Sequence, residues 1–431
     1  MESDPTRICQ ILVGLPDVAV LGVEDLPAGG PVTVHIESLV EQDRCPRCRG
    51  AGWVKERPVV VLTDLPAFGR PVRLAWHKVR RTCPDGGCPQ GSWTSSDDRI
   101  AASRSTVTHR AGRWMTEQVG RARRAVAVVA RELGCDWHTV NDAMVGYGAL
   151  LVDHPDRIGA VTAIGLDETL FNRTGKYRKL VWATTIADVG GHRLIDITPG
   201  RDTGSVIDWL AGRPQGWLDA IEVGSLDMAA TYHCVYRLAL PDTTLVVDPF
   251  HRVKLANTCL DKVRRSVQNA VLGHRGRKDD PLYRARRLLT KAHERVDDRG
   301  RAKPVELLAA GDPDGHVTTA WQAKDAVRTH YAMPDQDTAE AFLRALSDDL
   351  RCPERQPETR KLGRTLRTWF KEIVAWHTTR ASNGPTEGQN NLIKATKRVG
   401  SGFRSFRNYR IRVLLDAGAP DWNLLPTLTP R

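Results

Sequence analysis

Acidic side chains at three places in this chain have the surroundings needed for phosphate chemistry. Glu387 precedes a segment, residues 388–415, that contains seven Lys or Arg and no Asp or Glu. A carboxylate beside such a basic, phosphate-attracting surface is suited to binding a divalent metal ion. The other two, Asp167 and Asp227, each follow a short apolar run. These three residues are the candidates for a metal site that acts on a phosphate group.

The positions of Asp167 and Asp227 predict that they lie side by side. The apolar runs 160–166 and 221–226, typical of buried strands, end at these aspartates. If the two strands are neighbours in a central sheet, their ends meet, and adjacent carboxylates repel each other unless cations neutralise them. Because Asp is also common in turns, an ordinary turn role remains the alternative. The third carboxylate would come from a late helix that carries Glu387.

Two further acidic residues compete for the metal. Glu168 directly follows Asp167, so on a strand its side chain points to the opposite face, which argues against it. Asp248 ends the apolar run 244–247, and His251 follows three positions later. We expect Asp248 either to touch the metal or to hold His251 behind it. His251 could sit near the reacting phosphate or be a hydrogen-bonded core histidine.

Three carboxylates suffice for phosphodiester cleavage by two Mg²⁺ ions, or by Mn²⁺. Two such ions, roughly 3.5–4 Å apart, activate the attacking water or 3′-hydroxyl and stabilise the leaving oxygen. Magnesium takes its oxygen ligands from a few carboxylates, from water and from the phosphate. No covalent enzyme intermediate is needed, so Ser225, Tyr232 and Tyr409 are not assigned as nucleophiles.

Four of the nine cysteines form two close pairs, Cys45 with Cys48 and Cys83 with Cys88. Two knuckles that each present two thiolates are what a tetrahedral zinc ion requires, and a closed site of this kind is structural. The alternative is a set of unpaired reduced cysteines. His77 could replace one ligand, although its place on an apparent strand favours an ordinary half-buried histidine.

The secondary-structure elements that must position these residues are predicted to be mainly strands in residues 160–247 and mainly helices in residues 252–379. Three antiparallel strands, then helix, strand, helix and strand, are predicted around the apolar runs 160–166, 179–187, 192–197, 221–226 and 244–247. This order is that of a ribonuclease-H-like core. The stretch 252–379 reads as mostly helical and basic and is too long for a loop, which predicts an inserted helical domain.

A basic helical segment before these strands predicts a helix-turn-helix. Residues 101–131 contain seven Arg and one acidic residue, and the pattern continues with a turn at Gly134 and an N-cap at Asp136. Any helical hairpin with a glycine turn looks similar, so plain packing is the alternative to DNA recognition. The second helix is expected to carry Thr139, Asn141 and Asp142 outward. The DNA-contacting candidates are Arg121, Arg123, Arg124, Thr139 and Asn141.

A second group of DNA-contacting candidates follows Glu387. Phe403, Phe406 and Tyr409 recur every third residue, and each is followed by an arginine. A helix here would carry an aromatic stripe that anchors it to the sheet beside an arginine stripe that contacts phosphates. The basic candidates are Lys394, Lys397, Arg398, Arg404, Arg407 and Arg410.

The bulk composition agrees with a nucleic-acid partner. The chain has 431 residues and a formal net charge of +12, and its length predicts several domains. A basic surface also suits ribosomal or anionic-membrane binding. The sequence has no apolar run long enough to cross a membrane, and residues 1–5 are unlike a basic signal-peptide start. We therefore expect a cytoplasmic protein without a membrane partner.

Four ordered motifs resemble those of the ISL-three family of bacterial insertion-sequence transposases, over nearly the whole chain. They lie at residues 165–168, 226–232, 247–265 and 382–407. The resemblance implies a ribonuclease-H-like DDE catalytic core with Asp167, Asp227 and Glu387 as its triad, preceded by a zinc-binding domain and a helix-turn-helix. Asp248 and His251 match an Asp-x-x-His motif of relatives whose core is interrupted by a helical insertion.

These observations predict a multidomain protein of mixed α+β and α/β class. The expected parts are a β-rich zinc-binding domain at 1–98, a helix-turn-helix at 99–152, the core at 157–251 and 380–418, a helical insertion at 252–379 and an irregular tail at 419–431.

The expected function is that of a DNA transposase associated with the bacterial nucleoid. It would bind the terminal inverted repeats of its element, cut there and join the 3′-hydroxyl ends to target DNA. Two DNA ends must meet for this, which implies a homodimer or larger assembly. The alternatives are a structure-specific nuclease with the same metal core and a zinc and helix-turn-helix regulator that has lost catalysis.

Overall fold

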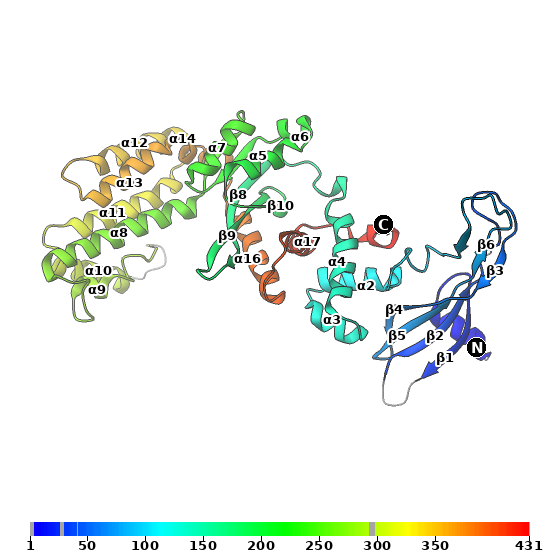
Figure 1. The fold of residues 1–431 in the computed structure, drawn as a ribbon. Coiled ribbons are helices and arrows are strands. Elements are labelled where there is room, and N and C mark those ends of the chain that lie inside the picture. The colour runs from blue at the N-terminus through cyan, green and yellow to red at the C-terminus, as the bar shows by residue number, and fades with distance from the viewer. Residues whose placement is uncertain (1–3, 26–29, 41, 293–297, 431) are drawn as a thin grey trace. The chain divides into compact units, whose positions relative to one another are not determined.

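The computed structural model describes residues 4–25, 30–40, 42–292 and 298–430. The chain forms two compact units, here named the terminal unit (residues 1–158 and 392–431) and the central unit (residues 159–391) (Figure 1). The division falls within one helix, α16 (Gly384–Val399).

The terminal unit begins with a helix and a four-stranded sheet in the order β1-β2-β5-β4. β2 and β5 are parallel, and the other two pairs are antiparallel. Ile36, Leu74 and Trp76 lie in the core of this sheet, and none is more than 3% exposed. The bounds are α1 Pro5–Val13, β1 Val18–Asp25, β2 Val32–Ser38, β4 Val59–Ala67 and β5 Arg70–His77.

A second sheet of three short strands in the order β3-β6-β7 carries the cysteine pairs. Cys45 and Cys48 precede β3, and Cys83 and Cys88 lie between β6 and β7. The predicted β-rich character of this region is confirmed. The bounds are β3 Trp53–Glu56, β6 Arg80–Thr82 and β7 Ser92–Thr94.

Helices complete the terminal unit, and the caps predicted for two of them are confirmed. α3 ends at Gly134, which has a φ of 59° that favours glycine, and Asp136 accepts a hydrogen bond from the Thr139 N–H at the start of α4. α17 packs against α4 and α2. The bounds are α2 His109–Gly120, α3 Val126–Leu133, α4 Trp137–Val152, η1 Pro155–Arg157, α17 Phe406–Ala417 and η4 Trp422–Thr427.

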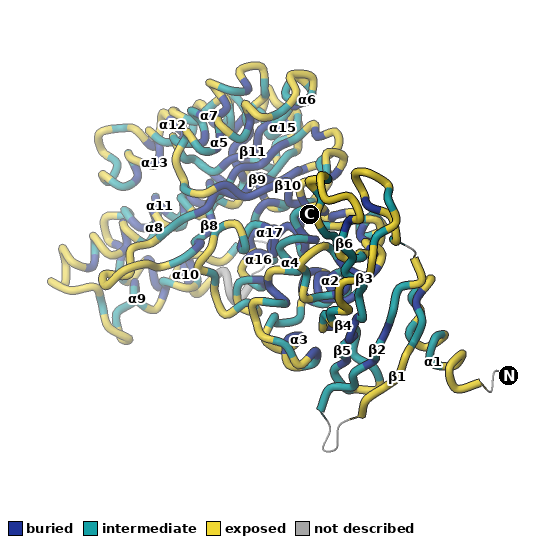
Figure 2. The backbone as a smooth tube through the Cα atoms, turned by 45° about the vertical axis from the view of Figure 1, so that its right-hand side comes forward, coloured by how far each residue is buried: buried dark blue, intermediate teal, exposed yellow. Residues whose placement is uncertain are grey.

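The central unit is built on a five-stranded sheet in the order β10-β9-β8-β11-β12. β8 and β11 are parallel, as are β11 and β12, whereas β9 is antiparallel to both β8 and β10. All five predicted strands are present, and long stretches of them are buried (Figure 2). The bounds are β8 Ala163–Thr174, β9 Lys179–Asp188, β10 Arg193–Pro199, β11 Val223–Leu226 and β12 Thr244–Val247.

The first of these strands is longer than predicted. We expected it to end at residue 166 with Asp167 at its end, but β8 continues to Thr174 through its pairing with β9. Only the pairing with β11 stops, at Leu166. The apolar run marked the part of β8 that lies between two neighbouring strands, because beyond it the strand is less buried and its sequence is more polar.

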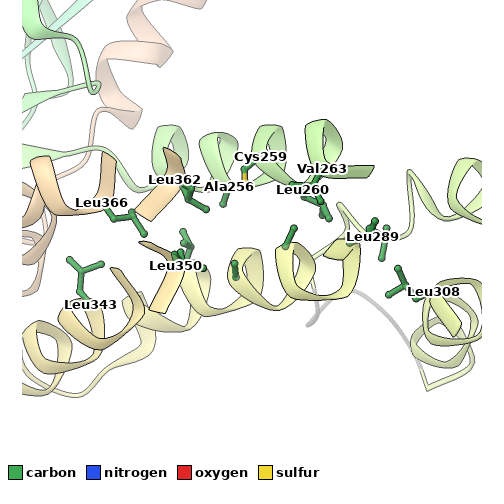
Figure 3. Close-up of a cluster of buried hydrophobic side chains, with 14 of the residues drawn as sticks. Ala256, Cys259, Leu260, Val263, Leu289, Leu308, Leu343, Leu350, Leu362 and Leu366 are labelled. Atoms are coloured by element: carbon green, nitrogen blue, oxygen red, sulfur yellow. The ribbon is translucent and has the colours of Figure 1, made fainter. Parts of the chain in front are cut away.

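The helices of the central unit include the predicted helical stretch, which is confirmed between α8 and α15. Ala256, Leu260, Leu343 and Leu362 belong to one buried apolar cluster shared by these helices (Figure 3). Val247 of β12 belongs to the same cluster, so the helices continue the core of the sheet. The bounds are α5 Thr203–Ala211, α6 Gln215–Asp219, α7 Ala230–Ala239, α8 Pro249–Leu272, α9 Pro281–Ala285, α10 Asp298–Gly311, α11 His316–Thr329, η3 His330–Ala332, α12 Gln336–Arg351, α13 Pro357–Thr368, α14 Phe370–Val374 and α15 Trp376–Thr379.

Candidate active site and metal centre

Parallel pairing of β8 with β11 brings Asp167 beside Asp227. The last paired residues are Leu166 and Leu226, and each aspartate is the next residue along its chain. Burial raises the pKa of Asp227, the carboxylates of Asp167 and Glu168 raise it further, and His251 opposes them. The Asp227 Oδ1 atom is buried without a hydrogen-bond partner among the described residues. Such an oxygen retains the lone pairs that a metal ligand needs.

Glu387 lies in the first turn of α16, and Thr386 and Asn390 of this helix approach Gly165 and Asp167 of β8. Thr386 on this turn and Asn383 directly before the helix are 0% exposed, and a Cβ on Gly165 would clash with the Thr386 Oγ1. Glycine at this position therefore allows the start of α16 to approach the strand. Because Gly165 is two residues before Asp167, the same close packing fixes where Glu387 lies along β8.

Asp248 and His251 connect Glu387 with the start of α8. Asp248 is 2% exposed and accepts hydrogen bonds from the N–H groups of His251 (3.2 Å) and Asn383 (3.0 Å). The His251 ring lies between two carboxylates, with Nδ1 3.2 Å from Asp248 Oδ2 and Nε2 3.8 Å from Glu387 Oε1. The interaction with Asp248 raises the pKa of His251 against the effect of burial, and the charges of Asp227 and Asp167 add to this rise.

Asn390 belongs to this cluster, and the sequence reading missed it. Its Nδ2 donates to Asp167 Oδ2 over 2.7 Å, and its Oδ1 accepts from the Thr185 hydroxyl over 2.6 Å. The signal that could have found it is spacing, because residue 390 lies three positions after Glu387 and side chains three apart share one face of a helix. Its partner Thr185 had no signal of its own in the strand pattern.

Glu168 lies on the other face of the sheet, as strand alternation predicted. Thr185, which is paired with Asp167, contacts Asn390 of α16, whereas Thr184, which is paired with Glu168, lies 3.2 Å from the Tyr232 hydroxyl of α7. The Glu168 Oε1 atom lies 3.8 Å from the Arg201 Nη1 atom.

The four cysteines form a second, separate cluster. The Sγ atoms of Cys45 and Cys88 are 3.8 Å apart, those of Cys48 and Cys83 are 3.4 Å apart, and all four lie within 4.8 Å of one another. Thiolates bound tetrahedrally at about 2.3 Å from a zinc ion are about 3.8 Å apart. Within the described residues this is the only group of three or more His, Cys, Asp or Glu that meets so closely.

Short backbone turns hold the cysteines in place. The Cys45 N–H donates to the Gly50 carbonyl, and the Cys83 N–H donates to the Gly91 carbonyl. Burial tends to raise the pKa of the Cys45 thiol, but hydrogen bonds from the N–H groups of Cys48 and Arg47 bring it down to about 7. His77 lies in the other sheet and hydrogen-bonds to His35 over 2.9 Å, so the cluster is made of cysteines alone.

All eleven DNA-contacting candidates lie in the terminal unit. Six of them are exposed, namely Arg121, Arg123, Lys394, Arg398, Arg404 and Arg407. Several of the eleven form ion pairs within this unit, namely Arg121 with Glu117 (3.1 Å), Arg123 with Asp416, Arg124 with Glu132 and Arg410 with Asp153 (2.8 Å). A groove of about 780 Å³ is lined from both groups, with Trp137 and Asn141 on one side and Phe403 and Arg404 on the other.

Two expectations about these segments are wrong. Asn141 does not point outward, since it is 6% exposed and its Oδ1 accepts a hydrogen bond from Asn408 of α17. Helix α17 begins only at Phe406, so Phe403 lies before it, and α17 packs on α4 and α2. Tyr409 is fully buried, with the rings of Phe403 and Phe406 5.3 and 6.0 Å away. Helical spacing indicated an aromatic cluster, but it did not indicate which element the cluster covers.

A family model described as a transposase matches residues 164–413, which is more than half of the chain. The chain belongs to the ISL-three family of insertion-sequence transposases. The matched region contains Asp167, Asp227 and Glu387 together with Asn390. Membership of this DDE family implies a divalent metal ion and action on DNA.

Within the described residues, no helix is both long and apolar enough to span a membrane.

Curated relatives extend the similarity beyond this region. The transposase is 23% identical over 403 residues to the transposase for insertion sequence element IS1001 of Bordetella parapertussis, an alignment that covers 89% of this chain and 91% of the relative. It is 27% identical over 292 residues to the transposase for IS1557 of Mycobacterium tuberculosis, covering 62% of this chain and 63% of that relative.

Proposed function

We propose that this transposase binds the terminal inverted repeats of its element, cuts the DNA there and joins the 3′-hydroxyl ends to target DNA. The observation that carries the proposal is the register of β8 and β11, which brings Asp167 beside Asp227, while Asn390, one turn after Glu387 on α16, hydrogen-bonds to Asp167. These contacts support a shared site, at one end of the sheet, for three acidic residues that are distant in sequence. The sheet order β10-β9-β8-β11-β12 and the helical stretch after β12 support a ribonuclease-H-like core with an insertion.

Asp167, Asp227 and Glu387 would hold the two Mg²⁺ or Mn²⁺ ions. The fit rests on the chemistry of the donors, since all three are carboxylates and Asp227 Oδ1 has no partner among the described residues. When bound, the ions supply an activated oxygen nucleophile and stabilise charge on the leaving oxygen. Glu168 is not part of this set because it lies on the opposite face.

The protein's own residues orient this site. Asp248 fixes both the first turn of α8 and the segment that leads into α16, through the N–H groups of His251 and Asn383. His251, held beside Asp248 and 3.8 Å from Glu387, places a protonatable ring among the carboxylates. The raised pKa of His251 favours the protonated form of the ring, and positive charge there would offset the repulsion between the carboxylates before DNA arrives.

The terminal unit would hold the repeat sequence. Its exposed arginines and lysines come from two distant chain segments, α2 to α4 and α16 to α17, that pack into one body around the groove between Trp137 and Arg404. Basic side chains on such a surface bind phosphates, whereas the groove offers aromatic and polar groups for base contacts.

The cysteine cluster would bind a structural zinc ion that stabilises the β3-β6-β7 sheet. Because two DNA ends must be joined, we propose a homodimer or larger assembly.

Incubation of the full chain with Mg²⁺, a labelled terminal-repeat duplex and target plasmid tests this function. We expect cut product and joined product, both lost when EDTA is added. Cutting without joining would instead identify a structure-specific nuclease, and binding without cutting would identify a regulator.

A further inference from the structure

Asn390 forms a continuous hydrogen-bonded bridge across the proposed site. It is 4% exposed, and it links Thr185 of β9 to Asp167 of β8 from its place on α16. An ionised carboxylate only accepts hydrogen bonds, so the amide nitrogen must face Asp167 and the amide oxygen must face the Thr185 hydroxyl. The bridge therefore has one orientation.

The bridge belongs to a face of α16 that is polar although it is buried. Asn383, Thr386 and Asn390 follow one another at helical spacing and are all 4% exposed or less. A buried polar face costs stability unless its groups are hydrogen-bonded. Among these three side chains, Asn390 donates a hydrogen bond to a carboxylate of the proposed metal site. Its partner Asp167 also accepts a hydrogen bond at Oδ1 from the N–H of Glu168, over 2.8 Å.

We propose that Asn390 is a positioning residue that orients the Asp167 carboxylate for metal binding and keeps it in register with Glu387. This inference rests on the proposed function, since it assumes that Asp167 is a metal ligand. Hydrogen-bond donors at both oxygens of the Asp167 carboxylate restrain the rotation of the group. Asn390 and Glu387 share one helix face, so the helix that brings the third acid also fixes the first.

Substitution Asn390→Leu keeps the volume and removes both hydrogen bonds. Residues that orient metal ligands typically contribute about 10–100-fold to metal affinity. We expect the Mg²⁺ concentration for half-maximal cutting to rise about 10–100-fold, and Mn²⁺ binding to the DNA-free full chain, followed by electron paramagnetic resonance of free Mn²⁺, to weaken by a similar factor. Terminal-repeat binding without metal should not change.

Two amides next to Asn390 provide matched controls. Gln389 is also buried but donates to the His192 carbonyl over 2.7 Å, and Asn391 is exposed. Gln389→Leu should lower the melting temperature without changing the metal concentration for half-maximal cutting, and Asn391→Leu should change neither. If all three variants shift the metal dependence equally, or if Asn390→Leu does not shift it, the positioning role is wrong.

A double-mutant cycle with Thr185→Val tests the bridge itself. Because both residues act through one chain of hydrogen bonds, Thr185→Val should weaken Mn²⁺ binding in the natural chain and have no added effect beside Asn390→Leu. Additive effects would contradict the bridge. If instead Asp167 is not a metal ligand, Asp167→Asn would leave Mn²⁺ binding and cutting unchanged. This result distinguishes failure of the proposed metal site from failure of the positioning role alone.

Discussion

The cysteine cluster and the acidic cluster are both candidate metal sites, yet their geometry differs. The four sulfur atoms lie within 4.8 Å of one another, and no other described group of three or more ligand side chains meets as closely. The acidic residues come from β8, β11 and α16 and leave an oxygen of Asp227 without a hydrogen bond in the described structure. The cysteine cluster can supply all four ligands of a metal ion, whereas the acidic cluster would leave ligand positions for water or phosphate.

This difference matches what each ion would do. A structural zinc takes all four ligands from the protein and stabilises the fold. Magnesium in phosphoryl chemistry keeps places for water and phosphate, so its protein ligands are fewer and need not enclose it. Loss of the first metal should therefore affect folding, and loss of the second should affect only chemistry.

Removal of zinc should have the largest effect. Structural zinc sites contribute about 10–16 kcal/mol in small zinc-binding peptides, so Cys48→Ser combined with Cys83→Ser should unfold the β3-β6-β7 sheet. Metal analysis of the natural chain should find about one zinc per chain. Cys352→Ser, outside the cluster, should retain the zinc. An unchanged hydrogen-exchange pattern at this sheet after chelation would show that the cluster needs no metal.

Asp227→Asn should reduce cutting strongly while leaving the fold intact, the opposite of what zinc removal does. We expect cutting to fall about 1,000-fold or more, because several kcal/mol of charge stabilisation by the metal is lost. Since burial and neighbouring carboxylates raise the pKa of Asp227, its charged form disfavours folding at neutral pH, and the neutral amide should leave the melting temperature equal or higher. A lower melting temperature together with normal cutting would remove Asp227 from the site.

The sequence predicted the cysteine cluster and the position of Asp167 and Asp227 after two apolar runs, although β8 continues beyond Asp167, because both features depend on local spacing. Two or four residues between paired cysteines indicate a metal-binding knuckle, and an apolar run followed by Asp indicates a strand. Asn390 and Thr185 escaped detection because their roles depend on which helix covers which strand. The errors at Asn141 and α17 have the same cause, because α4 and α17 pack on each other although Asn141 and Asn408 are more than 250 residues apart in the sequence.

The arginines of the terminal unit should have a moderate effect that depends on salt. Arg404→Ala combined with Arg407→Ala removes two exposed charges, so the slope of log affinity against log salt should become shallower by about 1.8 for duplex DNA. Binding titrations with the terminal repeat at several KCl concentrations measure this slope. Arg351→Ala, on α12 of the central unit, is the matched control and should leave it unchanged.

The smallest effect concerns a buried histidine of η3, His330, which hydrogen-bonds to Arg252. Burial lowers the pKa of His330 to about 3, whereas it is about 6.5 in an unfolded chain. As the pH is lowered, the ring is therefore protonated in the unfolded chain before it is protonated in the folded chain. The free energy of unfolding is consequently highest well above pH 6.5 and decreases as the pH falls below that value. We expect a loss of about 0.8 kcal/mol at pH 6. Urea unfolding should show this loss, and His330→Asn should reduce it.

Cutting of a terminal-repeat duplex by Glu387→Gln in Mg²⁺ tests the central claim most directly. Glu168→Gln is its matched control, because Glu168 is next to Asp167 but faces α7. The account predicts that Glu387→Gln binds the repeat normally and yields no cut product, whereas Glu168→Gln still cuts. Normal cutting by Glu387→Gln would contradict the assignment of Asp167, Asp227 and Glu387 as one metal site.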